Sequence, residues 1–134
     1  MTSEQLVVDA SAIVRLLIDS DRPGKAVADR IAGSRPHAPA HLPIEVTSAL
    51  RQLRYAGKLA ESEAVLALRG FWSLPIELWP QESISERTWE LGPNLTAYDA
   101  AYVALAEKIG GALLTADARL SRAPGIKCAI EVFL

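Results

Sequence analysis

Residues 5–9 read QLVVD, a short apolar run that ends in a single carboxylate. A run of this length and apolarity is typical of a strand buried on both faces, as in a parallel sheet. The next residues change period, because the apolar side chains of 11–19 have the spacing of a helix. The stretch therefore predicts a strand that turns into a helix, with Asp9 at the turn.

The same alternation continues to the end of the sequence. Further strands are predicted over 37–42, 74–79, 112–115 and 127–133, and helices over 11–19, 25–32, 43–56, 61–71, 82–91, 96–109 and 117–121. Alternating strands and helices indicate a parallel sheet covered on both faces. We therefore expect an α/β protein, with one domain over residues 1–134. Its three α/β/α layers should enclose a central parallel sheet of four to five strands.

Composition excludes several classes of protein. The 134 residues carry a net charge of −2, unlike a uniformly basic nucleic-acid binder. No apolar stretch is long enough to span a membrane, and no basic region precedes the first apolar run, as a secretory signal requires. One cysteine, Cys128, precludes an internal disulfide and suits the cytoplasm. The two histidines, His37 and His41, are too few for a Cys/His zinc site.

Four carboxylates are expected at one edge of the sheet. Asp9 ends the first strand, and Asp117 lies two residues past the strand at 112–115. Glu45 and Asp99 lie in the first turns of their helices, and nothing basic is immediately beside any of the four. Ligands of α/β proteins bind outside the carboxyl ends of the strands. Oxygen ligands suit Mg²⁺ or Mn²⁺ rather than zinc, and such clusters serve metal-assisted phosphodiester hydrolysis.

Each acid also has a purely structural explanation. Asp9 and Asp117 can cap the helices that follow them, and Asp99 has capping-box spacing to Thr96. Glu45 can complement the dipole of its helix. Together, however, several carboxylates at one edge repel one another and need a compensating cation. The pattern as a whole therefore favours a metal site.

Four segments, LVVDAS, LPIEVTSALR, TAYDAAYVALAE and LLTAD, resemble the PIN-domain ribonucleases. The resemblance is strongest to the VapC-type toxins of prokaryotic toxin–antitoxin pairs. It covers nearly the whole chain in the family's order, and only the loop 78–94 matches loosely. The resemblance implies an acidic catalytic site with hydroxyl groups that support it. These positions are Asp9, Glu45, Asp99 and Asp117, supported by Ser11 and Thr115.

The resemblance also implies the activity. We expect a Mg²⁺-dependent endoribonuclease, with Mn²⁺ as a possible substitute, acting on structured or single-stranded RNA such as tRNA or rRNA. Asp9, Asp99 and Asp117 would hold the metal, and Glu45 would bind it or orient the attacking water. The backbone of RNA needs cationic partners. Candidates for that role are Arg15, Arg51 and Arg54.

The same resemblance implies two protein partners. A VapB-type antitoxin is expected to place an arginine in the acidic pocket, because arginine pairs with carboxylates in a bidentate way. Apolar segments at 13–17 and 50–53 are candidate grooves for its helix. A homodimer is expected through the region from Trp89 to Tyr102, which is rich in large apolar side chains.

Two other functions stay open at this point. Receiver domains and haloacid-dehalogenase-like phosphatases also place an aspartate after the first strand beside Mg²⁺. Asp9 lacks the neighbouring acid of a receiver, however, and Ser11 stands where such a phosphatase has its second acid. The remaining alternative is a dimerising interaction module without catalysis, in which the four acids only cap helices.

Overall fold

The computed structural model, which describes residues 4–18 and 22–133, contains one five-stranded sheet. The strands are β1 (Glu4–Val8), β2 (Ser34–Pro39), β3 (Glu77–Trp79), β4 (Ala112–Thr115) and β5 (Ile130–Val132). Their order across the sheet is β3-β2-β1-β4-β5, and every neighbouring pair is parallel. The prediction of a parallel sheet of four to five strands is confirmed.

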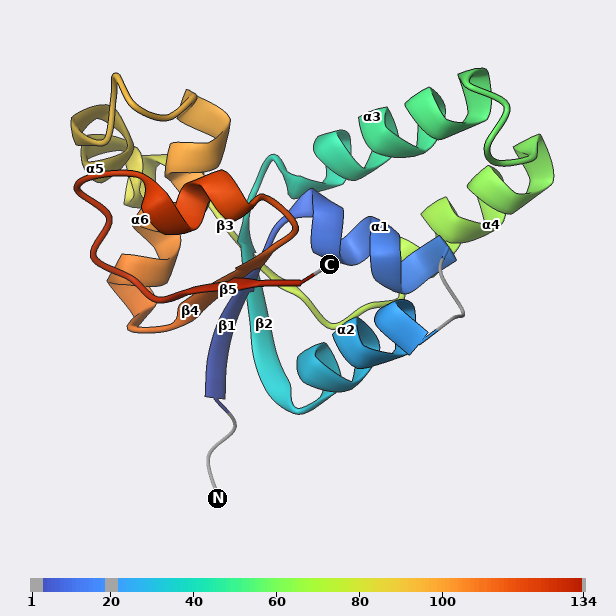
Figure 1. Ribbon diagram of the computed structural model, residues 1–134, viewed down its shortest axis with the longest axis horizontal. Helices are drawn as coiled ribbons and strands as arrows, with labels where there is room; N and C mark the ends of the chain where they lie inside the picture. The colour runs from blue at the N-terminus through green and yellow to red at the C-terminus, as the bar shows by residue number, and fades with distance from the viewer. Residues whose placement is uncertain (1–3, 19–21, 134) are drawn as a thin grey trace.

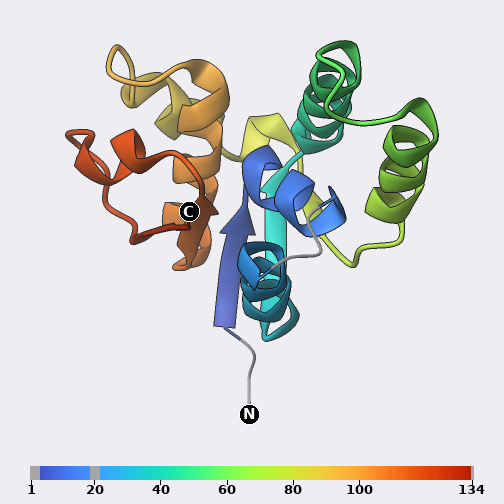
Figure 2. The same cartoon turned by 45° about the vertical axis from the view of Figure 1, so that its right-hand side comes forward.

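Helices cover both faces of this sheet. They are α1 (Ala10–Ile18), α2 (Arg22–Ala32), α3 (Leu42–Tyr55), α4 (Glu61–Trp72), α5 (Ser85–Glu90) and α6 (Ala97–Ile109), with 3₁₀ turns η1 (Gln81–Ser83) and η2 (Ala118–Arg122). The chain moves outward from β1 to β3 and then returns across the sheet to β4. Because such crossovers are right-handed, this reversal puts α1 to α4 on one side and α5 and α6 on the other. Figures 1 and 2 show these two groups of helices on either side of the strands.

The core lies on both faces of the sheet, with α1 to α4 on one side and α6 on the other. Leu6, Val7 and Val8 of β1 are fully buried, and every residue of α6 from 100 to 106 is buried. A helix that is apolar all round must be enclosed on all sides, and α6 lies between the sheet and α5. No helix in the described part of the chain is both long and apolar enough to cross a membrane.

Several predicted boundaries were wrong for identifiable reasons. β2 begins at Ser34 rather than at residue 37, because Pro36 and its polar neighbours hide the strand pattern. The helix predicted over 25–32 begins at Arg22, because a proline is accepted in the first turn of a helix, where its missing N–H is not needed. Asp19, the predicted end of the first helix, lies outside the described residues.

The other differences shorten or divide predicted elements. The predicted helix 82–91 is divided into η1 and α5, and the one predicted over 117–121 is the 3₁₀ turn η2. The predicted strands 74–79 and 127–133 shrink to the three residues each of β3 and β5. Both are edge strands of the sheet, so each has a partner on one side only.

The neighbours β1 and β4 define the place where a site is expected. The connection that leaves β1 goes to one face of the sheet, and the one that enters β4 comes from the other face. Such a switch in direction leaves a crevice at the carboxyl ends of the two strands. The other ends of these strands are also very close, because a Cβ added at Gly111 would lie 2.6 Å from the Gln5 carbonyl oxygen.

Candidate active site

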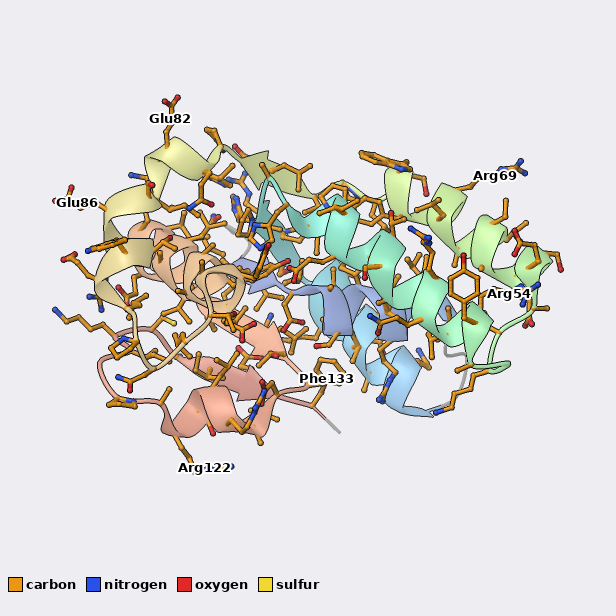
Figure 3. The ribbon with its side chains drawn as sticks, turned by 90° about the horizontal axis from the view of Figure 1, so that it is seen from above. Arg54, Arg69, Glu82, Glu86, Arg122 and Phe133 are labelled. Atoms are coloured by element: carbon orange, nitrogen blue, oxygen red, sulfur yellow. The ribbon has the colours of Figure 1, made fainter. Side chains whose placement is uncertain are left out.

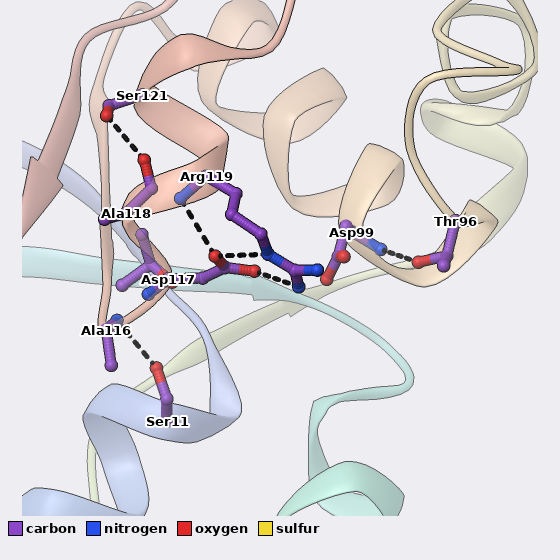
Figure 4. Close-up of polar contacts among 9 residues, drawn as sticks. Ser11, Thr96, Asp99, Ala116, Asp117, Ala118, Arg119 and Ser121 are labelled. Atoms are coloured by element: carbon purple, nitrogen blue, oxygen red, sulfur yellow. Dashed lines mark hydrogen bonds and ion pairs between the residues drawn. The ribbon is translucent and has the colours of Figure 1, made fainter.

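Asp9 lies at the carboxyl end of β1, in the crevice beside β4. Its Oδ1 accepts hydrogen bonds from Ser11 Oγ at 2.6 Å and from the Ala12 amide at 3.1 Å, so Asp9 does cap α1. The Ser11 hydroxyl also accepts a bond from the Ala116 amide at 2.9 Å (Figure 4). Ser11 therefore fixes Asp9 and joins the end of β1 to the loop that follows β4.

Asp99 lies in the first turn of α6. Its amide donates to the N-cap hydroxyl of Thr96 at 3.1 Å, which is the first half of the predicted capping box. This cap uses the backbone of Asp99 and the side chain of Thr96. The carboxylate of Asp99 also interacts with the Thr96 hydroxyl, which opposes the rise in its pKa, and it lies beside Arg119 and Asp117 (Figure 4).

The charges of these acids affect one another. Burial raises the pKa of Asp9, the hydroxyls of Ser11 and Thr115 oppose that rise, and the charge on Asp99 adds to it. Burial also raises the pKa of Asp99, and the charges on Asp117 and Glu45 raise it further. Asp99 is therefore within electrostatic reach of the three other acids, in a place where a cation would be stabilising.

Arg119 supplies a positive charge at this place. Asp117 caps η2 through the Arg119 amide at 3.0 Å, and it binds the Arg119 guanidinium through both oxygens at 3.0 and 2.8 Å. Arg119 thereby lowers the pKa of Asp117. The sequence prediction missed this residue, although it lies only two positions after Asp117. The Asp117 amide donates to the buried hydroxyl of Thr115 at 3.1 Å.

Glu45 has a different set of partners. Its Oε1 accepts a hydrogen bond from the Tyr102 hydroxyl at 2.6 Å, and His41 Nε2 lies 3.2 Å from the same oxygen. Burial alone would raise the pKa of Glu45, but His41 and Tyr102 outweigh it, so the pKa is lowered. Sequence reasoning missed both partners. The signal for His41 was its position four residues before Glu45, one helical turn away.

The acidic side chains are not arranged as a complete metal-binding site in this structure. Within residues 4–18 and 22–133, no three histidine, cysteine or acidic side chains are close enough together to hold a metal ion. One cause is visible in Figure 4, where the Arg119 guanidinium binds Asp117 and lies beside Asp99. The donor atoms at the crevice are nevertheless carboxylate oxygens, the type that Mg²⁺ and Mn²⁺ prefer, and Mg²⁺ keeps several of its waters.

Two of the three arginines predicted to bind RNA, Arg51 and Arg54, lie on the hairpin of α3 and α4, apart from this crevice. Arg54 forms an ion pair with Glu61 at 3.0 Å, near the connection between α3 and α4 (Figure 3). It is nine residues after Glu45, or roughly 13 Å along the helix. Arg51 lies over the Tyr55 ring at 5.8 Å on the same hairpin. Arg15 of α1 lies over the Phe133 ring at 5.4 Å.

Comparison with known proteins gives a consistent result. The family model described as PIN domain matches residues 6–126. The chain is 39% identical over 127 residues to ribonuclease VapC12 of Mycobacterium tuberculosis, covering 95% of this chain and 98% of that protein. It is 42% identical over 120 residues to ribonuclease VapC3 of the same organism, covering 90% and 88% respectively.

Solved structures share the fold. PAE2754 from Pyrobaculum aerophilum superposes with a TM-score of 0.68 at 26% identity, over 96% of this chain and 84% of that one. A DNA-bound VapBC from Salmonella typhimurium gives a TM-score of 0.68 at 14% identity, over 95% and 98%. At that identity, the second likeness concerns the fold alone.

Proposed function

Because the chain belongs to the PIN-domain family as a VapC-type endoribonuclease toxin, we propose that it hydrolyses RNA at the crevice between β1 and β4. The family match over residues 6–126 also decides against a receiver or haloacid-dehalogenase-like domain and against a purely structural role for the fold. The observation that supports the site assignment is the electrostatic effect between Asp99 and acids of three other segments, namely Asp9, Glu45 and Asp117.

We propose Mg²⁺ as the cofactor, with Mn²⁺ able to substitute. Asp9, Asp99 and Asp117 would hold it, partly through water. The residues fit such an ion because their donors are oxygens and because burial and mutual repulsion raise the pKa of two of them, so a cation would stabilise their ionised forms. When bound, the ion lowers the pKa of water and neutralises charge that develops on the phosphate.

The protein residues supply the geometry of the reaction. Ser11 and the Ala12 amide fix the carboxylate of Asp9, so one ligand is held rigidly to β1. Glu45 is ionised at neutral pH and takes the proton of the attacking water at its carboxylate. The water oxygen forms a bond to phosphorus, the bond from phosphorus to the leaving ribose oxygen breaks, and that oxygen takes a proton from solvent.

The substrate is RNA, with tRNA or rRNA proposed as the class. Arg15, Arg51 and Arg54 are the proposed contacts to its backbone. Neutralising phosphates releases counterions, so alanine at Arg51 and Arg54 should reduce the salt dependence of RNA binding. Cellular RNA of this kind is met in the cytoplasm, where we propose that the protein acts.

We propose a VapB-type antitoxin as a protein partner. Solved relatives of this fold include VapBC assemblies. A groove between α3 and α4 is lined by Leu50, Val65 and Leu68, and the exposed Leu66 and Ile44 lie on the same two helices. An antitoxin helix would cover this apolar surface, and an antitoxin arginine would bind the free acids of the crevice. Co-expression followed by affinity capture of the tagged chain tests this partner.

A homodimer is also proposed, through the region from Trp89 to Tyr102. Within it Leu91 and Tyr102 are buried in the single chain, whereas Trp89 is 87% exposed and Tyr98 61% exposed. Exposed aromatic side chains of this size are typical of interfaces. Light scattering at tens of micromolar tests this, and a monomeric mass would contradict the proposal.

The experiment that tests the catalytic proposal is cleavage of cellular RNA with Mg²⁺ and with EDTA. Glu45→Gln, and Asn at each of the three aspartates, should each reduce the rate by orders of magnitude, because the four acids act as one unit. Parent-like cleavage by Asp9→Asn or Asp99→Asn would contradict the site assignment. Mapping the cut positions would identify the RNA.

A further inference from the structure

We infer that Tyr102 is a positioning residue for this reaction, which holds one oxygen of Glu45 so that the other faces the attacking water. The inference rests on the proposed function, in which Glu45 accepts the proton of that water. Tyr102 does not touch the substrate in this scheme. It acts through Glu45, and His41 assists it.

The hydrogen bond from Tyr102 connects two elements of the site. Tyr102 lies on α6, three residues after Asp99 and therefore on the same side of the helix. Its side chain is 2% exposed, and its hydroxyl crosses to the first turn of α3 to reach Glu45 Oε1 at 2.6 Å. One helix therefore carries an acid of the site and also the group that places a second acid.

The geometry leaves the two oxygens of Glu45 in different situations. Oε1 is contacted by the Tyr102 hydroxyl and lies 3.2 Å from His41 Nε2. Oε2 accepts no hydrogen bond from any residue that the structure describes. A carboxylate fixed through one oxygen keeps the other as a base in a defined direction, which is what an attacking water requires.

His41 is held in place to complete this arrangement. Its ring contacts the Tyr102 ring edge to face at 5.0 Å between centroids and the Tyr98 ring at 5.6 Å. Its Nε2 is buried and lies 3.2 Å from Glu45 Oε1, and this contact helps to lower the pKa of Glu45. The same carboxylate oxygen is therefore held by both Tyr102 and His41.

If the Tyr102 hydroxyl served only the packing of the core, replacing tyrosine by phenylalanine would leave catalysis unchanged. Phenylalanine fills the same volume as tyrosine, so packing of α6 against the core would survive its introduction. The hydrogen bond to a carboxylate is charge-assisted and short, which makes it well suited to fixing a side chain. Loss of this bond would free the Glu45 carboxylate to rotate, and catalysis is sensitive to errors of about 1 Å.

The test compares Tyr102→Phe with Tyr98→Phe, a neighbouring tyrosine on the same helix whose ring also contacts His41. With Mg²⁺ and a defined RNA, Tyr102→Phe should lower kcat at least tenfold and leave KM within twofold, whereas Tyr98→Phe should match the parent. Calorimetric titration with Mn²⁺ should give the same affinity for Tyr102→Phe and parent, because Glu45 is not a metal ligand in this scheme. A weaker Mn²⁺ affinity would overturn that scheme.

A double variant separates positioning from general damage. Tyr102→Phe combined with Glu45→Gln should be no slower than Glu45→Gln alone, because Tyr102 acts only through that carboxylate. A further tenfold loss in the double variant would overturn the inference. His41→Phe, which keeps the ring packing, is the second variant and should lower kcat by a smaller factor at unchanged KM.

The outcomes distinguish this inference from the proposed function. Parent-like kcat in a folded Tyr102→Phe, together with an inactive Glu45→Gln, overturns the positioning role and leaves the proposed catalytic site unaffected. Parent-like cleavage by Glu45→Gln instead overturns the role of Glu45 itself. Should Tyr102→Phe lose its fold by circular dichroism, the kcat of His41→Phe decides.

Discussion

The guanidinium of Arg119 binds both carboxylate oxygens of Asp117, at 3.0 and 2.8 Å, although only one residue separates the two in the sequence. Figure 4 shows the same guanidinium beside Asp99. The crevice therefore contains a positive charge of its own at the position where the proposed cofactor needs two carboxylates. The Arg119 side chain is 82% exposed, so this pair adds little stability and can open readily.

Arg119→Gln should therefore bind divalent metal more tightly. In the parent, the metal must displace the guanidinium from Asp117 before it can use that carboxylate. In the variant this competition is absent, so we expect Mn²⁺ affinity to rise several-fold in calorimetric titration. Metal that binds the folded state more tightly stabilises it more, so the rise in melting temperature on adding metal should also be larger in the variant.

Arg122→Gln is the matched control for this change. Arg122 lies on the same 3₁₀ turn, and its charge also acts on Asp117, but it forms no ion pair that the structure records with that residue. Both variants lose one positive charge. Equal Mn²⁺ affinities for the two would mean that net charge, and not displacement of the guanidinium, controls metal binding.

Asp99→Asn should raise the melting temperature in EDTA. The pKa of Asp99 is raised by burial and by the charges on Asp117 and Glu45, so its ionised form costs stability at neutral pH. Asparagine removes that charge and leaves the Thr96 cap in place. The same variant should lose most of the stabilisation that the parent gains from Mg²⁺ or Mn²⁺.

The pH dependence of this effect has a definite sign. Protonation of Asp99 relieves the same repulsion, so the advantage of Asp99→Asn should shrink as the pH falls from neutral through the raised pKa of Asp99. Melting curves of parent and variant in EDTA, at pH 7.5 and at pH values approaching 4, measure it. The contrary result is a variant that melts below the parent at pH 7.5 and keeps the full rise in melting temperature on adding metal. That result would show that Asp99 caps α6 and does not bind the metal.

The buried His37 of β2 should make stability fall in mild acid. Its Nδ1 accepts a bond from the Trp79 indole at 3.0 Å, and its ring also bonds to Gln5. Burial lowers the pKa of His37, although Glu77 opposes the shift. The unfolded chain therefore binds a proton more readily, and stability decreases as the pH falls below about 6.5, by at most ~1.4 kcal/mol per unit.

Urea unfolding in EDTA at pH 7.5 and 5.5 checks this for the parent and for His37→Gln, which keeps an acceptor for Trp79. We expect the parent to lose more stability than the variant over this interval. The other titrating groups are common to both proteins and cancel in the comparison. Equal losses in the two proteins would show that His37 does not contribute.

Gly111→Ala should destabilise the protein by about 1–3 kcal/mol, because the new Cβ would lie 2.6 Å from the Gln5 carbonyl oxygen and the backbone of β1 would have to move. Gly33→Ala is the control, since its Cβ would meet nothing closer than 3.6 Å. Thermal unfolding of the two variants measures the difference. Equal stability of the two would mean that β1 and β4 can separate at little cost.

The strands that are buried on both faces could be predicted from the sequence, and the bounds of the edge strands could not. The run at 5–9 and the run at 112–115 became β1 and β4, because their apolar content reflects burial on both sides. A strand was also predicted over 127–133, yet only Ile130–Val132 pairs with β4. Local sequence records burial well, but where an edge strand stops depends on its single neighbour.

The same distinction holds for the site. The four acids were predicted from their places at strand ends and helix starts, which are local properties. The contacts of Glu45 with Tyr102 could not be predicted in this way, because they depend on how α3 and α6 approach each other. Arg119 was close enough in sequence to be noticed, but its direction toward Asp117 and Asp99 depends on the 3₁₀ turn that carries it.

The position of β4 between β1 and β5 also affects when the protein becomes harmful. Asp9 is made first of the four acids, and its neighbour in the crevice, Asp117, follows a strand that is made more than 100 residues later. Until that strand has been made, the chain has only part of the proposed acidic site. A ribosome that translates this protein is exposed to a complete nuclease only after β4 has emerged and paired with β1.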